Sequence, residues 1–178
     1  MNSGSWDRLV TDRLVLRRFR PDDRGPFARI NADEEVTRYL SGPMSRAESD
    51  AFVDRIDQHW AAWGYGLYAV EHRTDGDLLG FVGLSHHRAQ PHAVEVGWRL
   101  AVAAWGRGLA TEGARAVVRV AFGDIGLDSL VSITTDENMA SRRVMDKLGF
   151  RYVCHIPFER WNLRVAALER ESAPLPEE

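Results

Sequence analysis

The sequence feature that most constrains the fold is a change of hydrophobic period within residues 94–122. Apolar residues alternate with other residues over positions 94–100, which predicts a half-buried strand. Over positions 114–122 they recur at intervals of three and four, which is typical of an amphipathic helix. Between the two segments, residues 105–111 read WGRGLAT. The pattern therefore predicts a strand, a glycine-containing loop and a helix in direct succession.

The loop before this helix has the properties of an anion-binding site. The first turn of a helix leaves backbone N–H groups without partners, and the helix dipole is positive there. Gly106 and Gly108 would allow an anion to approach that backbone closely. We therefore expect a diphosphate to bind the segment Gly106, Arg107, Gly108, Leu109, Ala110 and Thr111. The alternative interpretation is a glycine-rich turn before an ordinary helix.

Two common phosphate-binding loops do not fit these residues. A P-loop requires Gly-Lys-Ser/Thr, whereas Gly108 is followed by leucine and alanine. A Rossmann fingerprint requires a small third residue where Thr111 stands, and neither its parallel crossover nor its acidic ribose ligand is evident.

The similarity to a known pattern extends beyond the loop. It includes residues 11–17 (TDRLVLR), 95–98 (EVGW), 105–112 (WGRGLATE) and 138–150 (NMASRRVMDKLGF). These segments resemble the acetyl-coenzyme A (acetyl-CoA) binding core of the GNAT superfamily of N-acetyltransferases. Within it, the chain is most similar to the branch that acetylates the N-termini of ribosomal proteins. Two long blocks in the right order make the resemblance specific, and it covers nearly the whole chain except its last few residues.

The resemblance implies both a fold and a reaction. The fold class is α/β, with a mixed, splayed central sheet flanked by helices. The reaction moves an acetyl group from acetyl-CoA, as co-substrate, to a primary amine by direct attack in a ternary complex. The leading acceptor is a protein or peptide N-terminal amine. A small-molecule amine (polyamine, antibiotic or amino acid) and a non-catalytic acyl-CoA sensor remain as alternatives.

The resemblance also assigns roles to individual residues. Glu95 would be the general base, acting directly or through water, and Ser141 would hydrogen-bond the sulfur. Besides the loop, the cofactor would contact Leu100, Ala101, Val102, Asn138 and Arg143. The alternatives are a solvated strand glutamate at 95, a helix-capping Asn138, an ordinary first-turn serine at 141 and a solvated Arg143.

Two residues depart from the family pattern. Many members place a tyrosine, the acid for the departing thiolate, where this chain has Met145. Met145 is the one feature that favours the sensor interpretation. Trp105 stands where glutamine or arginine is usual, which leaves phosphate binding to backbone donors.

Other polar residues have open roles. His86 and His87 are adjacent on an expected strand and should face opposite ways, and His92 follows in a loop, so we expect no metal site. A histidine lining the acceptor site is an alternative to plain exposure. The acidic residues 33–35 either attract a cationic amine or simply begin a helix.

The remaining pattern predicts a mixed α/β sheet. We expect strands over residues 14–19, 67–71, 78–85, 129–134, 152–156 and 163–168. Helices should begin at Pro21 and Asp33, follow the Ser45–Glu48 capping box as far as Gly64, and occupy residues 139–148. The helix after Ser45 should bury Phe52, Ile56, Trp60 and Trp63. Residues 1–171 should form one domain, and residues 172–178 a flexible tail.

Composition limits the possible partners. The net charge of −3 and the pI of about 6.1 argue against nucleic acid or an anionic membrane as a partner. Cys154 is the only cysteine and cannot form an internal disulfide. With no membrane-spanning run and no signal-peptide core in residues 1–30, we expect a cytoplasmic protein. A homodimer remains an open possibility.

Overall fold

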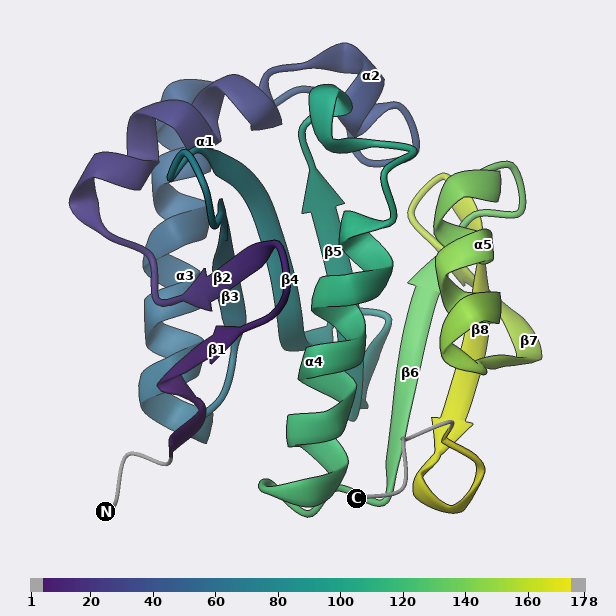
Figure 1. The fold of residues 1–178 in the computed structure, drawn as a ribbon. Helices are drawn as coiled ribbons and strands as arrows, with labels where there is room; N and C mark the ends of the chain where they lie inside the picture. Colours follow the sequence, from purple (N-terminus) through teal and green to yellow (C-terminus); the bar gives the residue numbers. More distant parts are fainter. Residues whose placement is uncertain (1–4, 174–178) are drawn as a thin grey trace.

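The computed structural model describes residues 5–173, which form one eight-stranded sheet with helices on both faces (Figure 1). The strands lie in the order β1-β2-β3-β4-β5-β6-β8-β7. Their bounds are Arg8–Val10 (β1), Leu14–Arg17 (β2), Leu67–His72 (β3), Leu78–His87 (β4), Gln90–Leu100 (β5), Ser129–Thr134 (β6), Arg151–Phe158 (β7) and Trp161–Glu169 (β8).

Five α-helices in this part of the chain cover the sheet. They are Arg24–Asn31 (α1), Glu34–Thr37 (α2), Arg46–Trp63 (α3), Leu109–Gly123 (α4) and Met139–Leu148 (α5). Short 3-10 helices occupy Ser5–Asp7, Pro21–Asp23, Val102–Ala104 and Arg170–Ser172. Within residues 5–173, no helix combines the length and the hydropathy needed to cross a membrane.

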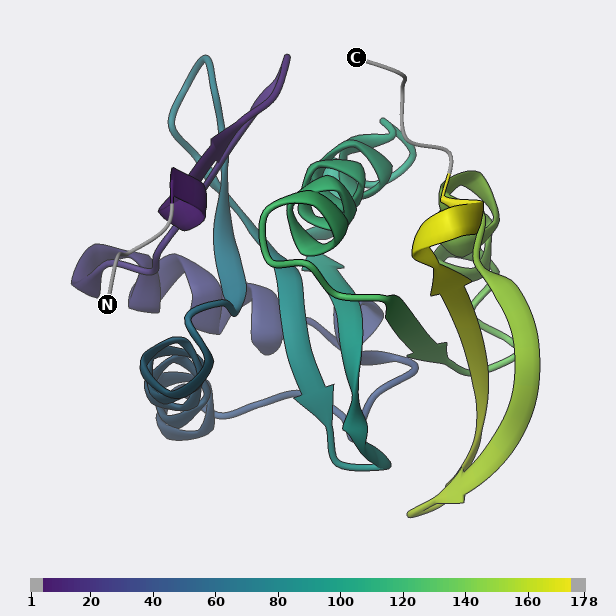
Figure 2. The same cartoon turned by 90° about the horizontal axis from the view of Figure 1, so that it is seen from below.

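Neighbouring residues of β4 show which helices cover each face. Phe81 packs against Phe27 of α1 and Phe52 of α3, with ring centroids 6.2 and 5.8 Å apart. Val82 points the other way, and its side chain lies against Gly113 of α4. Two views at right angles place α4 and α5 on one side of the sheet and α1 and α3 on the other (Figures 1 and 2).

The sheet is mixed and opens at its centre, as expected. Only β5 and β6 pair in parallel, and they share a single bridge, between Glu95 and Val131. Every other pair of neighbouring strands is antiparallel and has a ladder of at least three residue pairs. Beyond the bridge β5 and β6 diverge (Figure 1).

Local sequence signals predicted several element ends correctly. Ser45 caps α3 in a capping box with Glu48, and Gly64 ends that helix in the left-handed conformation at φ 74°. The expected bounds of β6 and α5 match the structure, and Gly149 ends α5 at φ 88°. Of the tail expected over residues 172–178, residues 174–178 lie outside the described part of the chain.

Two expectations about elements were wrong. The strand β1 was missed because three residues are too few to show an alternation. Trp63 was placed on the buried face of α3, but it is 57% exposed. The residues of α3 that the core covers include Val53, Ile56 and Trp60. Trp63 occupies the last turn, where α3 extends past the rest of the core.

The carboxylate of Glu112, in the first turn of α4, ties that helix to the edge of the sheet. It accepts hydrogen bonds from Thr11 Oγ1 (2.6 Å), the Arg13 backbone N–H (2.9 Å) and Arg13 Nε (2.7 Å). Arg13 Nη1 in turn donates to the carbonyl of Arg107 at 2.9 Å. Residues 11–13 and the glycine loop, far apart in sequence, are therefore one structural unit.

Replacing Glu112 with alanine should destabilise the protein by about 2 kcal/mol, since it removes several charge-assisted hydrogen bonds at once. Urea unfolding at pH 7 measures this. Burial acts to raise the pKa of Glu112, but the bonds from Thr11 and Arg13 outweigh it and lower that pKa. The stabilisation that the Glu112 carboxylate provides should therefore be complete above the ordinary glutamate pKa. It should disappear as the pH falls through the lowered pKa that Glu112 has in the folded protein. Exposed Glu137→Ala is the control; an equal effect of both variants would contradict the assigned role.

Candidate active site

Glu95 lies where the two parallel strands separate. Its side chain shares the α1 and α3 face of β5 with Gly97 and Arg99, because alternate residues of a strand face the same side. Ser85 Oγ, opposite on β4, donates to Glu95 Oε2 at 3.5 Å. The pairing of β4 and β5 is continuous through Gly97, and its register shift lies in β4, between Ser85 and His87.

The environment of Glu95 changes its acidity. Burial raises the pKa of this carboxyl from 4.5 to about 8, although the Ser85 hydroxyl and the backbone N–H of Ile133 act to lower it. A carboxyl with this pKa is mostly protonated at neutral pH. Above pH 8 it is ionised and able to take a proton from an ammonium group.

The edge of β5 that faces β6 has unpaired backbone donors. The N–H of Ala101 donates to the Leu79 carbonyl of β4 at 2.8 Å. Since N–H groups alternate along a strand, those of Trp98 and Leu100 point the other way, into the opening left by β6. Ala101 was predicted as a cofactor contact beside Leu100 and Val102, but its own N–H is already bonded. The available donors on this edge come from Trp98 and Leu100.

The loop between β5 and α4 presents a series of backbone N–H groups. Gly106 and Gly108 adopt left-handed conformations, at φ 72° and 77°, and the first α4 hydrogen bond runs from Glu112 N–H to the Gly108 carbonyl. In the described part of the chain, no group accepts a hydrogen bond from the N–H groups of residues 106–111. Trp105 does not supply a side-chain donor, because its indole N–H bonds the Leu100 carbonyl at 2.8 Å.

A groove of about 620 Å³ begins beside this loop. It is lined by Val10, Thr11, Asp12, Arg13, Gly108, Thr111, Glu112, Arg115, Ala116, Arg119 and Lys147. Arg13 is engaged by Glu112 at 2.6 Å. The other basic side chains of the groove are Arg115, Arg119 and Lys147. Their positive charge favours the binding of a polyanion that also contacts the loop.

The second sequence block begins α5 at the end of β6. Asn138 caps the helix, and its Oδ1 accepts a hydrogen bond from Ser141 N–H at 3.1 Å. Ser141 is half-buried, whereas Arg143 is exposed. Met145 lies one turn after Ser141 on the same face and is 2% exposed, within the core. Ser141 therefore lies in the first turn of α5, on the same face as the buried Met145.

The histidines are separated, as expected from their adjacency. His86 Nδ1 hydrogen-bonds His59 Nε2 at 3.1 Å and its ring packs against that of Trp63 at a tilt of 39°, whereas His87 packs edge-on against Phe158. His92 is exposed. Among residues 5–173, no three His, Cys, Asp or Glu side chains are grouped to hold a metal ion.

Three loops meet on the α3 side of the sheet. Glu159, in the β7–β8 hairpin, accepts from Ser41 at 3.4 Å and from Arg88 of the β4–β5 hairpin at 3.5 Å. Arg160 donates to the Leu40 carbonyl at 3.1 Å. Figure 2 shows both hairpins projecting to the same side of the sheet. Sequence reasoning missed Ser85, Arg99 and Glu159, because these contacts join segments that carry no local motif.

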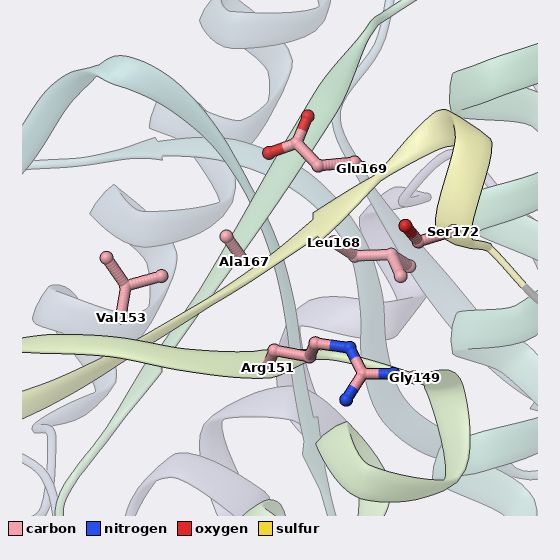
Figure 3. Close-up of a pocket in the computed structure, with 7 residues that line it drawn as sticks. All are labelled: Gly149, Arg151, Val153, Ala167, Leu168, Glu169 and Ser172. Atoms are coloured by element: carbon pink, nitrogen blue, oxygen red, sulfur yellow. The ribbon is translucent and has the colours of Figure 1, made fainter.

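A smaller pocket lies along the edge pair β7 and β8 (Figure 3). It has a volume of about 200 Å³ and is lined by Gly149, Arg151, Val153, Ala167, Leu168, Glu169 and Ser172. Arg151 and Glu169 are its only charged residues, and none of the predicted site residues belongs to it. It is therefore not the candidate site.

Comparison with known proteins identifies the class. An acetyltransferase structure from Agrobacterium tumefaciens str. C58 superposes with a TM-score of 0.82 at 25% identity, covering 91% of this chain and 94% of that one. The model of the acetyltransferase (GNAT) domain matches residues 13–151, so the chain belongs to the GNAT family. It is accordingly an acyltransferase of the acetyl-CoA-dependent class.

Two relatives of Bacillus subtilis (strain 168) are similar over most of their length. The uncharacterised protein YkkB is 30% identical over 93% of this chain and 96% of its own length. The uncharacterised N-acetyltransferase YoaA is 31% identical over 80% of this chain and 82% of its own.

The raised pKa of Glu95 predicts a pH-dependent stability difference. The folded protein should hold this proton up to about pH 8, whereas the unfolded chain releases it near 4.5. The unfolding free energy of the wild type, compared with that of Glu95→Gln, should therefore decrease as the pH rises from 4.5 to about 8. Above about pH 8 the difference between the two proteins should stay constant. Denaturant unfolding from pH 4 to 9 measures this. A difference that stays constant over this range would show that Glu95 has the same pKa in the folded and the unfolded protein.

Proposed function

We propose that the protein transfers an acetyl group from acetyl-CoA to a primary amine by direct attack in a ternary complex. The observation that carries this proposal is the position of Glu95, a carboxyl of raised pKa, at the point where β5 and β6 separate. Holding both reactants in one opening can supply roughly 7–11 kcal/mol of the barrier, so few acid–base groups are needed.

In this proposal the cofactor binds along β5 and the start of α4. The unbonded N–H groups of residues 106–111 receive the diphosphate. Arg115, Arg119 and Lys147 give the adjoining groove the charge that a phosphorylated nucleotide needs. The pantetheine arm lies beside residues 98–102, where it extends the edge of β5 in place of β6. Asn138 and Arg143 stand at the neighbouring helix start, where they would contact the arm and a phosphate.

The chemical steps use three groups of this chain. Glu95 takes a proton from the acceptor ammonium, directly or through water, which frees the lone pair for attack on the thioester carbonyl. The N–H of Trp98 stabilises the oxyanion that develops on that carbonyl. When the intermediate collapses, the C–S bond breaks and the thiolate leaves with a hydrogen bond from Ser141, since Met145 has no proton to donate. The nitrogen then loses its second proton, which reaches the thiolate directly or through water and yields the amide and free CoA.

A protein or peptide N-terminal amine remains the leading acceptor. The Bacillus subtilis protein YdaF, provisionally named a ribosomal N-acetyltransferase, is 23% identical over 79% of this chain. A small-molecule amine is the second candidate. The FsC-acetyl coenzyme A-N(2)-transacetylase of Aspergillus fumigatus is 46% identical, but over only 33% of this chain and 25% of its own length.

The first prediction concerns cofactor affinity. Gly108→Val places a branched side chain among the backbone donors, so calorimetry should show acetyl-CoA binding weakened by at least about tenfold. Valine is also strained at φ 77°. Gly126→Val is the matched control, because Gly126 has φ 80° in a turn beyond the other end of α4. Equal affinities for two folded variants would contradict the assignment of the loop.

The second prediction concerns the base. The rate of wild-type transfer should rise with pH through about 8, as Glu95 loses its proton. Glu95→Gln should lose this limb and reduce turnover by roughly 10²–10⁴-fold, with acetyl-CoA affinity unchanged. Steady-state rates of CoA release between pH 6 and 9.5 test it. A rate within a few-fold of wild type at every pH would make Glu95 a structural residue.

The third prediction concerns the leaving group. Ser141→Ala retains the backbone N–H that Asn138 caps, so α5 should remain folded. Turnover should fall up to about tenfold while acetyl-CoA affinity stays nearly constant, since a neutral hydrogen bond contributes only about 1 kcal/mol. Single-turnover rates isolate this step. Equal rates for the two proteins would leave Ser141 with a role only in the helix start.

A further inference from the structure

Arg99 is a partly buried cation, and no carboxylate of residues 5–173 pairs with it. Its Nη1 donates to Asn31 Oδ1 at 2.7 Å and to Met44 Sδ at 3.9 Å. Its guanidinium carbon lies 5.5 and 5.4 Å from the ring centres of Phe52 and Phe81. Its Nε is fully buried and has no acceptor among the described residues. All of these neighbours are neutral.

This arrangement is energetically unusual. Buried charges in proteins are normally paired, because an unpaired ion loses its hydration without compensation. The aromatic rings and the amide oxygen of Asn31 offset only part of that loss. Burial lowers the pKa of Arg99 to about 10, so the side chain is still charged at neutral pH. Arg17 of β2 provides the contrast, because it is 7% exposed and is paired with Asp23 and Glu71 at 2.7 Å each.

Arg99 also lies in line with the proposed base. Glu95, Gly97 and Arg99 occupy one face of β5, and the Cα atoms of the first and last are about 13 Å apart. A side chain at Gly97 would meet only the Glu95 carboxyl, whose nearest atoms are at 3.9 and 4.0 Å. At Gly97, midway between the two residues, no other side chain outside its chain neighbours comes within 4 Å of that Cβ position. A molecule lying along this face of β5 would meet a proton acceptor at one end and a cation at the other.

We propose that Arg99 binds a carboxylate of the acceptor, so that the enzyme selects amines that carry a carboxylate several bonds from the nitrogen. This inference rests on the proposed acetyl transfer and narrows its substrate class. The planar donors of a guanidinium match the two oxygens of a carboxylate. Such acceptors include long-chain ω-amino acids, short peptides with a free C-terminus and acidic N-terminal peptides; polyamines are disfavoured.

The direct test observes Arg99 itself. The arginine Nε–H signals of ¹⁵N-labelled wild-type protein are recorded by NMR, and the Arg99 signal is identified by its absence in Arg99→Lys. The ligands are 6-aminohexanoate and its uncharged counterpart 6-aminohexanamide, in the absence of acetyl-CoA. We expect a saturable shift of the Arg99 signal with the acid and none with the amide. Equal shifts with both compounds, or none with either, would overturn the proposal.

A kinetic test uses the same matched pairs. Acids and amides of the ω-amino series from glycine to 8-aminooctanoate are compared by kcat/KM. The best acid should exceed its amide by about tenfold or more, the range expected for a charge-assisted hydrogen bond. Arg99→Gln should abolish that ratio, and Arg99→Lys should reduce it while keeping the charge. An unchanged ratio in both variants would contradict the role of Arg99.

The proposed acetyl transfer and the proposed carboxylate binding by Arg99 are distinguished by different results. If no amine is acetylated, the proposed function fails, while the NMR titration still reports whether Arg99 binds a carboxylate. If amines are acetylated but acids and amides react equally, the function stands and the role of Arg99 is wrong.

Discussion

The single bridge between Glu95 of β5 and Val131 of β6 is the constraint on which the rest of the site depends. A parallel pair of strands that continued beyond it would bond every N–H along the edge of β5. Because β6 leaves after one bridge, the donors of Trp98 and Leu100 stay available to a ligand. The same separation places Glu95 inside the sheet, where burial raises its pKa to about 8. One local interruption of pairing therefore leaves free backbone donors and a carboxyl of raised pKa close to one another.

The second requirement is a fixed start for α4. The Glu112 carboxylate holds Thr11 and Arg13, and Arg13 holds the Arg107 carbonyl, so the glycine loop is anchored from outside. Residues 11–13, which lie in one of the segments that resemble the family, thus have a structural role in holding the loop. Gly106 and Gly108 can then keep left-handed conformations that direct backbone N–H groups outward. The contacts of Glu112 and Arg13 therefore hold the loop in place without using the backbone N–H groups of residues 106–111.

The sequence predicted what depends on near neighbours. The capping box at Ser45, the helix stops at Gly64 and Gly149, and the glycine loop are local signals, and the structure has each of them as an element boundary. The family resemblance added the splay of the sheet, which periodicity alone does not contain. Met145 stands out in the sequence because methionine cannot donate a proton, and the structure adds that this side chain is buried in the core, where a larger phenol would be overpacked.

Long-range contacts account for what the sequence did not predict. Arg99 meets Asn31 across 68 positions, and neither residue belongs to a motif. The sequence places Ala101 next to Leu100 at the end of the strand, but it does not show that the Ala101 N–H donates to the Leu79 carbonyl of β4. Trp63 fits the apolar stripe of α3, yet the core ends before it. In each case the deciding partner comes from another element, so periodicity along one segment carries no information about it.

The central claim is that backbone donors along β5 and at the start of α4 bind acetyl-CoA. Amide hydrogen exchange, measured by NMR with and without acetyl-CoA, tests it most directly because it reports each N–H separately. The account predicts slower exchange at Trp98, Leu100 and residues 106–111 when the cofactor is present, with the middle of α3 unchanged. Unchanged exchange at these donors under saturating acetyl-CoA would contradict it.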